Sequence, residues 1–305
     1  MKLLVTGSDG LVGSALKVLI KGDVFFATRR DADLTNFDET KSLMLRIKPD
    51  AVVHLAALVG GIGGNLMKSG DYFRKNLLVN ANVLETARIA GVNRLISYMS
   101  TCVFPDGGPY PLNVANLHNG QPHPSNFGYA YAKRMLEVQS RAYRAQWGSD
   151  YIVAIPTNIY GPNDNFSLTE GHVVPALIHK VYLAQSMETP LVVWGSGTPL
   201  REFIFSQDVA RLTLWMLENY FEPEPLILSA SSETSIKELT KLVIEKFDFL
   251  GEVIYDRNQP EGQHRKPSNC DPLTSILPNF KFTPLDVGLD QTISWFKGNY
   301  PEIRM

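Results

Sequence analysis

The sequence predicts an α/β protein with a doubly wound parallel sheet, followed by a smaller C-terminal lobe. Short apolar runs alternate with amphipathic helical stretches as far as about Gly161. This alternation is typical of strand–helix–strand units joined by right-handed crossovers. The first apolar run ends in a glycine-rich turn that opens a helix. After Gly161, loops rich in proline and glycine interrupt the pattern, which indicates the second lobe.

The composition is that of a globular enzyme. The chain has 305 residues, of which 44% are hydrophobic and 20% charged, so it can bury a large core. A net charge of -2 gives no overall field that would attract nucleic acid or an anionic membrane. Two cysteines, no signal peptide and no apolar run of about 20 residues predict a soluble cytoplasmic protein without a disulfide framework. No metal site is indicated.

The N-terminal turn predicts a dinucleotide site. A buried strand at residues 2–6 is followed by Gly7, Gly10 and Gly13 and then by a helix. In a Rossmann-type sheet, the first glycine permits a tight turn, the second lets backbone approach a pyrophosphate, and the third lets the helix pack on the strand. The helix N-terminus then offers free N–H groups to the phosphates. The expected cofactor contacts are Gly7, Ser8, Asp9, Gly10, Leu11, Val12 and Gly13.

The end of the second strand, residues 24–28, indicates which cofactor binds. Arg29 and Arg30 stand where this architecture meets the adenine ribose. An acidic residue there binds the 2′-hydroxyl of NAD, whereas an arginine accommodates the 2′-phosphate of NADP. The two arginines favour NADP, although Asp31 and Asp33 follow closely.

The next elements lead towards the same edge of the sheet. We expect a helix over residues 38–47 and a strand over residues 50–57 that contains His54 as a core histidine. The small residues ending this strand leave room for a cofactor. Residues 59–64 predict a mobile glycine-rich loop, and residues 71–90 predict a long amphipathic helix closed by Gly91.

Tyr129 and Lys133 form a candidate acid/base unit. They lie four residues apart in a predicted helix over residues 127–147, so both side chains leave one face. A nearby ammonium favours the phenolate and lowers the phenol pKa. The pair alone is weak, because this spacing occurs by chance on many helices. Ser100 strengthens it, since the preceding strand delivers that hydroxyl to the cofactor edge of the sheet.

The glycine turn, Ser100 and the Tyr129–Lys133 pair, in this order, resemble the extended short-chain dehydrogenase/reductase family. Further blocks are similar to those of the GDP-L-fucose synthases within that family, and together they cover nearly the whole chain. These blocks are residues 59–62, 100–105, 155–166, 171–178 and 193–203. The resemblance implies an NADP(H)-dependent enzyme acting on GDP-4-keto-6-deoxy-D-mannose. It would invert C3 and C5 and reduce the C4 ketone, giving GDP-L-fucose.

The resemblance also implies roles for individual residues. Cys102 matches the base and His172 the acid of the epimerisation, and Cys102 needs thiolate character for that role. Tyr129 would protonate the C4 oxygen, which Ser100 also holds. Lys133 would lower the Tyr129 pKa and bind the nicotinamide ribose. The remaining cofactor contacts implied by the resemblance are Pro156, Thr157, Asn158, Ile159 and His172.

The second half of the chain is expected to hold the nucleotide sugar. Trp194 would pack on guanosine and a group of cations would bind the diphosphate, while Glu261 is a further expected contact of the nucleotide sugar. The cations are Lys180, Arg201, Arg265 and Lys266. Lys180 stands where the family often has arginine, and Glu261 where it has aspartate. These departures keep the charge and change the geometry.

The resemblance suggests two domains and a dimer. Residues 1–161 would form the NADP-binding domain, to which a strand at 203–205, a helix at 208–218 and a strand at 226–229 would return. Residues 162–202 and 231–305 would form the substrate lobe. The family is usually a homodimer, joined through the helices at residues 71–90 and 127–147.

Two other functions stay open. One is a related nucleotide-sugar epimerase without net reduction, such as a GDP-mannose 3,5-epimerase. That family is similar around the cysteine but has a lysine as its second acid/base group, so His172 favours the synthase. The other is a non-catalytic NADP-binding regulator. Such proteins often lose the tyrosine or the lysine, whereas Tyr129 and Lys133 are both present.

Overall fold

Six parallel strands form the central sheet of the computed structural model, which describes residues 1–305. The sheet has the strand order β2-β1-β3-β4-β5-β9, so the chain reverses its winding direction between β1 and β3. Ligands of doubly wound sheets bind at the carboxyl ends of the strands beside such a reversal. The strands are β1 (Leu3–Thr6), β2 (Val24–Ala27), β3 (Ala51–His54), β4 (Arg94–Tyr98), β5 (Asp150–Pro156) and β9 (Leu226–Leu228).

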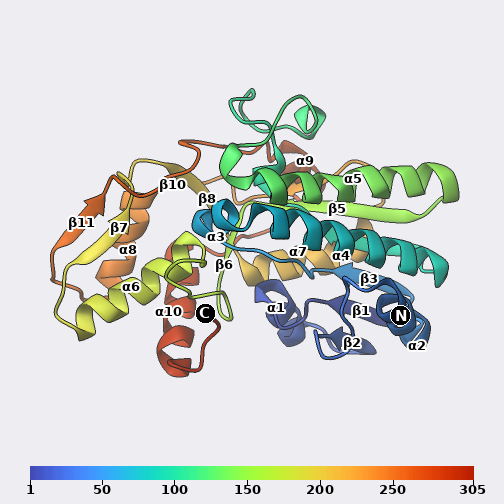
Figure 1. Cartoon of the computed structure of the whole chain (residues 1–305), viewed down its shortest axis with the longest axis horizontal. Coiled ribbons are helices and arrows are strands. Elements are labelled where there is room, and N and C mark those ends of the chain that lie inside the picture. The colour runs from blue at the N-terminus through green and yellow to red at the C-terminus, as the bar shows by residue number, and fades with distance from the viewer.

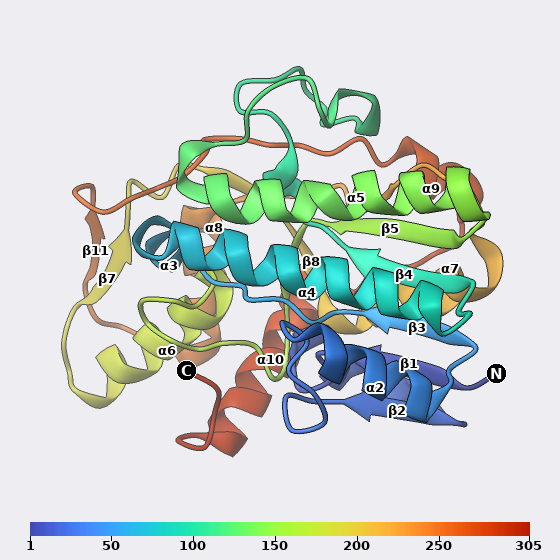
Figure 2. The same cartoon turned by 45° about the vertical axis from the view of Figure 1, so that its right-hand side comes forward.

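Helices cover both faces of this sheet (Figures 1 and 2). One hydrophobic core packs α2, α4 and α5 against one face, and a second packs α1 and α7 against the other. Burial on both faces explains why the strands are continuously apolar rather than alternating. These helices are α1 (Leu11–Leu19), α2 (Phe37–Ile47), α4 (Ser69–Ile89), α5 (Phe127–Trp147) and α7 (Ser206–Asn219).

A smaller lobe is built around a third hydrophobic core. It has a three-stranded sheet of order β10-β8-β6 and a parallel pair, β11 and β7. Its strands are β6 (Asn158–Tyr160), β7 (Leu191–Trp194), β8 (Leu200–Phe205), β10 (Glu233–Ser235) and β11 (Val253–Asp256). Its helices are α6 (Val173–Ser186), α8 (Ile236–Phe247) and α10 (Leu285–Asn299), while the short α9 (Asp271–Ile276) packs under β9.

Strand β8 contains the residues 203–205 that were expected to return to the first domain. It pairs with β6 and β10 instead of joining the central sheet. The place beside β5 is taken by β9. Strand β6, which follows β5 after Thr157, pairs with β8 instead. The following helix α7 and strand β9 do return to the central sheet.

The glycine-rich segment at residues 59–64 is more ordered than the sequence predicted. Helix α3 (Ile62–Met67) begins inside it, so the prediction of a loop is wrong for Ile62, Gly63 and Gly64. The Gly61 N–H donates to the Glu170 carbonyl at 2.7 Å, and a Cβ on Gly61 would lie 2.5 Å from the Gly171 carbonyl oxygen. The glycines therefore allow the backbone at Gly61 to lie close to the backbone at Glu170 and Gly171.

Two side chains behave as structural groups. His54 is fully buried between Thr6 and Asn80 and bonds both, as expected of a core histidine. Burial lowers its pKa to about 3, so it is neutral. Cys270 is a free, buried thiol, and Cys102 is the other free cysteine.

None of the helices has the length and apolar character needed to cross a membrane.

Candidate active site

A cavity of about 1180 Å³ lies between the strand ends of the central sheet and the smaller lobe. Its walls contain all of the residues that the sequence marked as site residues in the glycine turn, the Tyr129 helix and the later blocks, with two exceptions. They are Gly7, Asp9, Gly10, Leu11, Val12, Gly13, Arg29, Arg30, Ser100, Cys102, Tyr129, Lys133, Pro156, Thr157, Asn158, Ile159, His172, Lys180, Trp194, Arg201, Glu261 and Lys266. The exceptions are Ser8 and Arg265.

The two exceptions have different causes. Ser8 is fully buried beneath the glycine turn, and its hydroxyl has no partner. Its side chain therefore does not line the cavity. Arg265 is exposed and forms a bidentate pair with Glu233 on the outer side of β10, at 3.0 Å from Nε to both carboxylate oxygens. The expected diphosphate contact of Arg265 is not supported by this placement.

The glycine turn has the geometry that a dinucleotide needs. Gly7 adopts a φ of +69°, which favours glycine, and a Cβ on Gly13 would lie 2.6 Å from the Ser8 Cα. Helix α1 begins at Leu11 with Gly10 as its N-cap, and no side chain caps its free N–H groups. These groups are available for a phosphate at the cavity wall. The residues present thus fit a dinucleotide cofactor.

The end of β2 favours a phosphorylated ribose. Arg29 and Arg30 are exposed and line the cavity. The acidic residues that follow are engaged in their own loop. The Asp31 carboxylate accepts from the Thr28 N–H at 2.8 Å, and the Asp33 carboxylate accepts from the Thr35 N–H at 2.9 Å. The Arg29 and Arg30 guanidinium groups, which form no ion pair, are therefore the groups at this end of the cavity that can bind a phosphate.

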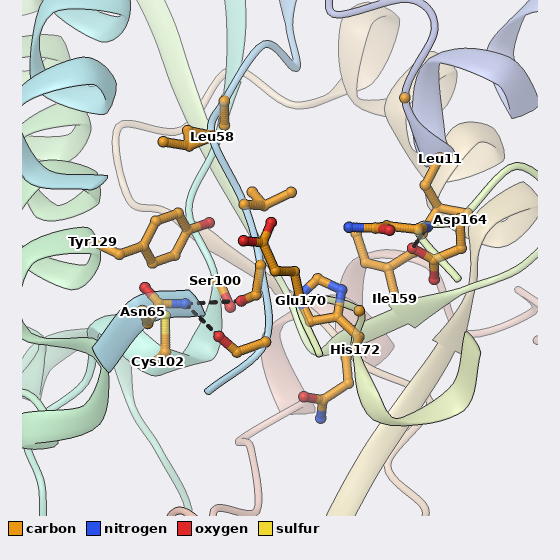
Figure 3. Close-up of a pocket in the computed structure, with 18 of the residues that line it drawn as sticks. Leu11, Leu58, Asn65, Ser100, Cys102, Tyr129, Ile159, Asp164, Glu170 and His172 are labelled. Carbon is orange, nitrogen blue, oxygen red and sulfur yellow. Dashed lines mark hydrogen bonds between the residues drawn. The ribbon is translucent and has the colours of Figure 1, made fainter. Parts of the chain in front are cut away.

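The acid/base groups gather on the opposite side of the cavity. Figure 3 shows Tyr129, Ser100 and Cys102 on one side, Leu11 and Asp164 on the other, and His172 between them. Ser100 follows β4, and Cys102 lies in the short helix η1 (Thr101–Val103) that comes next. Tyr129 stands in the first turn of α5.

Lys133 is held in place by the sheet. Its ammonium donates to the Tyr98 carbonyl at 2.9 Å and lies 6.0 Å from the centre of the Tyr129 ring. Burial lowers the pKa of Lys133 to about 8. Burial also raises the pKa of Tyr129 well above its ordinary value, with Cys102 and Tyr72 adding to the effect. The Tyr129 pKa is therefore not lowered as expected, because removal of the phenol from water dominates.

Cys102 and His172, the pair expected to carry out the epimerisation, are both uncharged at neutral pH. Burial raises the pKa of the Cys102 thiol, although Lys266, a hydrogen bond from Ser100, and Lys133 oppose it. Burial, Arg304 and Lys266 lower the pKa of His172. At neutral pH the site therefore holds a thiol and a neutral imidazole. The expected thiolate character of Cys102 is therefore not supported, because removal from water outweighs the nearby cations.

The substrate end of the cavity collects cations that have lost solvent. The Lys180 ammonium lies 4.8 Å from the centre of the Trp194 ring. Arg201 donates to the Glu261 carbonyl at 3.1 Å. Burial and the neighbouring Arg201 lower the pKa of Lys266 to about 8. Such a group of desolvated cations is stabilised by an anionic ligand.

Among the polar residues of the cavity that sequence reasoning missed, three stand out. Asn65 lines it from α3, donates to the Gly60 carbonyl at 2.8 Å and leaves its own carbonyl oxygen unpaired. Asp164 is 4% exposed, and its Oδ2 has no partner. Arg304 reaches the cavity from the C-terminal segment. Asp164 lies inside a recognised block, whereas no local signal marked Asn65 or Arg304.

Comparison with known proteins places the chain in a family. Residues 3–228 match the model of the NAD dependent epimerase/dehydratase family. A GDP-L-fucose synthase of Dictyostelium discoideum is 43% identical, over 99% of this chain and 97% of that protein. The GDP-L-fucose synthase of Escherichia coli (strain K12) is 31% identical, over 99% and 98%. A crystal structure of a GDP-L-fucose synthetase from Naegleria fowleri bound to NADP superposes with a TM-score of 0.93 at 38% identity, covering 99% of this chain and 96% of that one. The chain therefore belongs to the NAD dependent epimerase/dehydratase family, within its GDP-L-fucose synthase branch.

Proposed function

We propose that the protein converts GDP-4-keto-6-deoxy-D-mannose to GDP-L-fucose, by inverting C3 and C5 and reducing the C4 ketone with NADPH. The observation that carries this proposal is the shared cavity. A dinucleotide turn, a Tyr129–Lys133 pair, Cys102 and His172 all line it, so epimerisation and reduction can act on one bound sugar.

The ketone makes the epimerisation feasible. Protons on C3 and C5 are acidic because the carbanion delocalises as an enolate onto the C4 oxygen. One group removes a proton from one face and another returns a proton to the opposite face. We assign these roles to Cys102 as base and His172 as acid. On substrate binding the thiol proton of Cys102 is transferred to the neutral His172, which leaves a thiolate as the base and an imidazolium as the acid. Lys266 and Lys133 are the cations that favour the thiolate. Tyr129 and Ser100 hold the C4 oxygen during these steps.

The reduction takes place at the same C4 carbonyl group. Bound NADPH supplies the hydride that C4 receives. Tyr129 donates its phenolic proton to the C4 oxygen, and its raised pKa keeps that proton on the phenol until it is needed. Lys133, fixed by the Tyr98 carbonyl, binds the nicotinamide ribose. The 156–159 segment forms the neighbouring wall for the nicotinamide.

The two lobes divide the ligands between them. The central sheet and its helices, residues 1–161 with α7 and β9, bind NADP(H), with Arg29 and Arg30 at the 2′-phosphate. The remaining residues bind the nucleotide sugar. Trp194 packs on guanine, and Lys180, Arg201 and Lys266 bind the diphosphate. Glu261 fixes the loop that follows Trp194. Support for the last role comes from Glu261 Oε2, which accepts from the Ser196 hydroxyl at 3.1 Å.

The proposed assembly is a cytoplasmic homodimer. Helices α4 and α5 pack side by side and present one outer face of the molecule (Figures 1 and 2). Large apolar side chains remain exposed on these two helices: Phe73, Ile89, Phe127, Val138 and Trp147. A second copy that pairs its own α4 and α5 with them would bury this surface. Sedimentation equilibrium of the wild type and of Phe73→Lys tests this proposal, since the charge would separate a dimer joined here.

The function is tested by one incubation with GDP-4-keto-6-deoxy-D-mannose and NADPH. NADPH absorbance is followed, and the product is identified by chromatography and NMR. Loss of NADPH with formation of GDP-L-fucose is the expected result. GDP-D-rhamnose would keep the reductase and remove the epimerase. An epimerised ketone without NADPH loss would indicate an epimerase alone, and no reaction at all would indicate a binding protein.

A further inference from the structure

Asn65 lines the cavity with a buried amide group that is bonded at one end only. Its Nδ2 donates to the Gly60 carbonyl at 2.8 Å and to the Gly61 carbonyl at 3.1 Å. Since carbonyl oxygens only accept, these two bonds fix which end of the amide carries the nitrogen. The other end, Oδ1, has no partner within the chain, and the residue is 5% exposed. The cavity wall therefore presents a fixed acceptor without a donor.

A second asparagine shows an amide that serves the fold alone. Asn76 in α4 is fully buried and does not line the cavity. Its Nδ2 donates to the Leu58 carbonyl at 2.9 Å and to the Tyr72 carbonyl at 2.8 Å, while its Oδ1 accepts from the Leu58 N–H at 2.9 Å. Both ends of the Asn76 amide are thus bonded to backbone. Asn65 holds backbone in the same way with its nitrogen, and its oxygen is left for a ligand.

Packing places Asn65 beside Tyr129. Helix α3, which carries Asn65, packs against the short helix η3 (Pro124–Asn126), and η3 leads directly into α5. The Tyr72 ring meets the Tyr129 ring edge to face, with the ring centres 6.4 Å apart. A Cβ on Gly60, whose carbonyl Asn65 holds, would collide with the Tyr72 hydroxyl. Figure 3 shows Asn65 and Tyr129 on the same side of the cavity.

The backbone that Asn65 holds also meets the segment that carries His172. The Gly61 N–H donates to the Glu170 carbonyl at 2.7 Å, and Lys68 at the end of α3 forms an ion pair with the Glu170 carboxylate. His172 lies two residues further along and lines the same cavity. Asn65 therefore belongs to the part of the cavity where the hexose is proposed to react.

Two other side chains of the cavity, Thr157 and Asp164, also leave a buried polar atom unpaired. A threonine hydroxyl can rotate to donate or to accept, and a carboxyl can take up a proton and become a donor. An amide oxygen can only accept. Asn65 is therefore the residue of the three whose unpaired atom requires a donor whatever the pH, and sugar hydroxyl groups are such donors.

We propose that Asn65 Oδ1 accepts a hydrogen bond from the C3 hydroxyl of the bound hexose, and that Asn65 is thereby a specificity-determining residue. This inference rests on the proposed function. Tyr129 is assigned to the C4 oxygen, and of the two carbons beside C4, C3 carries a hydroxyl whereas C5 carries a methyl group. An acceptor beside Tyr129 therefore meets the C3 hydroxyl. The bond holds the ketone at Tyr129 and discriminates against sugars that lack this hydroxyl.

The test compares two sugar nucleotides, GDP-4-keto-6-deoxy-D-mannose and GDP-4-keto-3,6-dideoxy-D-mannose, which lacks only the C3 hydroxyl. Their affinities are measured by calorimetric titration in the presence of NADP⁺, which has no hydride to deliver. The wild type should bind the dideoxy sugar about three- to tenfold more weakly, because Oδ1 then stays unpaired. This comparison needs no variant.

Asn65→Ser isolates the acceptor. A serine hydroxyl at this position can still donate to the Gly61 carbonyl four residues earlier, but it is too short to replace Oδ1. The variant should bind the hydroxylated sugar about three- to tenfold more weakly than the wild type and the dideoxy sugar equally well. Asn76→Ser is the matched control, since it also removes an amide that holds backbone, and it should change both affinities by the same factor.

Three results would overturn this inference. Equal binding of the two sugars by the wild type would remove the hydroxyl contact, even if Asn65→Ser does not fold. Equal losses, or no loss, for both sugars in Asn65→Ser would leave Asn65 with a structural role. A loss confined to NADPH affinity would assign Oδ1 to the cofactor. These outcomes leave the proposed function intact, which fails only if the wild type does not convert the hydroxylated sugar with NADPH. Thermal unfolding confirms that each variant is folded.

Discussion

The two walls of the cavity present different protein groups to a ligand. The cofactor wall is mostly backbone: a glycine turn, an uncapped helix N-terminus and the ends of β1, β3 and β5. The substrate wall is mostly side chains, and its cations Lys180, Arg201 and Lys266 come from α6, β8 and the loop after β11. Backbone groups keep their polarity at any pH. The cations lose solvent, and burial lowers the pKa of each.

This difference indicates how the site meets two anionic ligands. The cofactor wall is fixed by the packing of the central sheet and needs few charges. The substrate wall holds its cations close together and out of water, which costs free energy until an anion binds. Between the walls lie Tyr129, Cys102 and His172, which burial keeps neutral at pH 7.

The largest expected effect is on hydride transfer. Tyr129→Phe removes the proton donor of the C4 oxygen and should lower the reduction rate by about 10²- to 10⁴-fold. NADPH affinity should stay nearly unchanged, because the cofactor wall is intact. Single-turnover NADPH oxidation and an NADPH titration measure the two quantities. Tyr131→Phe on the same helix is the control, and a Tyr129→Phe rate close to the wild type would contradict the assigned role.

The next effect separates the two chemistries. Cys102→Ser should block epimerisation, while reduction of the un-epimerised ketone persists as a side reaction that gives GDP-D-rhamnose. Product NMR distinguishes the two sugars. Cys270→Ser is the matched control, because Cys270 is a buried thiol outside the cavity. Normal output of GDP-L-fucose from Cys102→Ser would remove Cys102 from the mechanism.

A smaller effect should appear in the pH dependence of the substrate wall. The pKa of Lys266 is lowered to about 8 in the free protein, and a bound diphosphate favours its charged form. GDP affinity should therefore be constant below pH 8 and fall above it, by at most about tenfold per pH unit. Calorimetric titration between pH 6.5 and 9.5 measures this slope. Lys266→Met should bind more weakly and lose the slope, and an unchanged slope would assign it to another group.

The smallest expected effect tests the boundary of the substrate wall. Arg201 lines the cavity, whereas Arg265 is exposed and paired with Glu233. Arg201→Gln should weaken GDP roughly tenfold through loss of a charged contact. Arg265→Gln should change GDP affinity by less than about twofold, as is usual for exposed ion pairs. Equal losses in both variants would show that Arg265 turns into the site.

Most of the fold and of the cavity lining could be predicted because their signals are local. The glycine turn, the strand–helix alternation and the blocks around Cys102, Tyr129 and His172 each occupy a few neighbouring residues. Predictions failed where long-range packing decides. Helix α3 begins beside the Gly61 N–H that donates to the Glu170 carbonyl, and β8 pairs with β6 while β9 occupies the edge beside β5.

The charge states of the site belong to the same class of long-range effects. The Tyr129–Lys133 spacing correctly places both side chains at the cavity, but the pKa shifts depend on how much water the surrounding chain excludes. Arg304 could not be found from the sequence either. Its position depends on the pairing of Phe166 with a segment about 140 residues later, which no motif records.

The central claim is that one cavity carries out both epimerisations and the reduction. The most direct measurement is the reaction with NADPH in D₂O, followed by NMR of the isolated product. The account predicts GDP-L-fucose with deuterium at C3 and C5, delivered from solvent through the acid/base groups, and protium at C4, delivered as hydride. A reduced product with protium retained at C3 and C5 would show that the ketone is reduced without enolisation, and it would contradict the roles of Cys102 and His172.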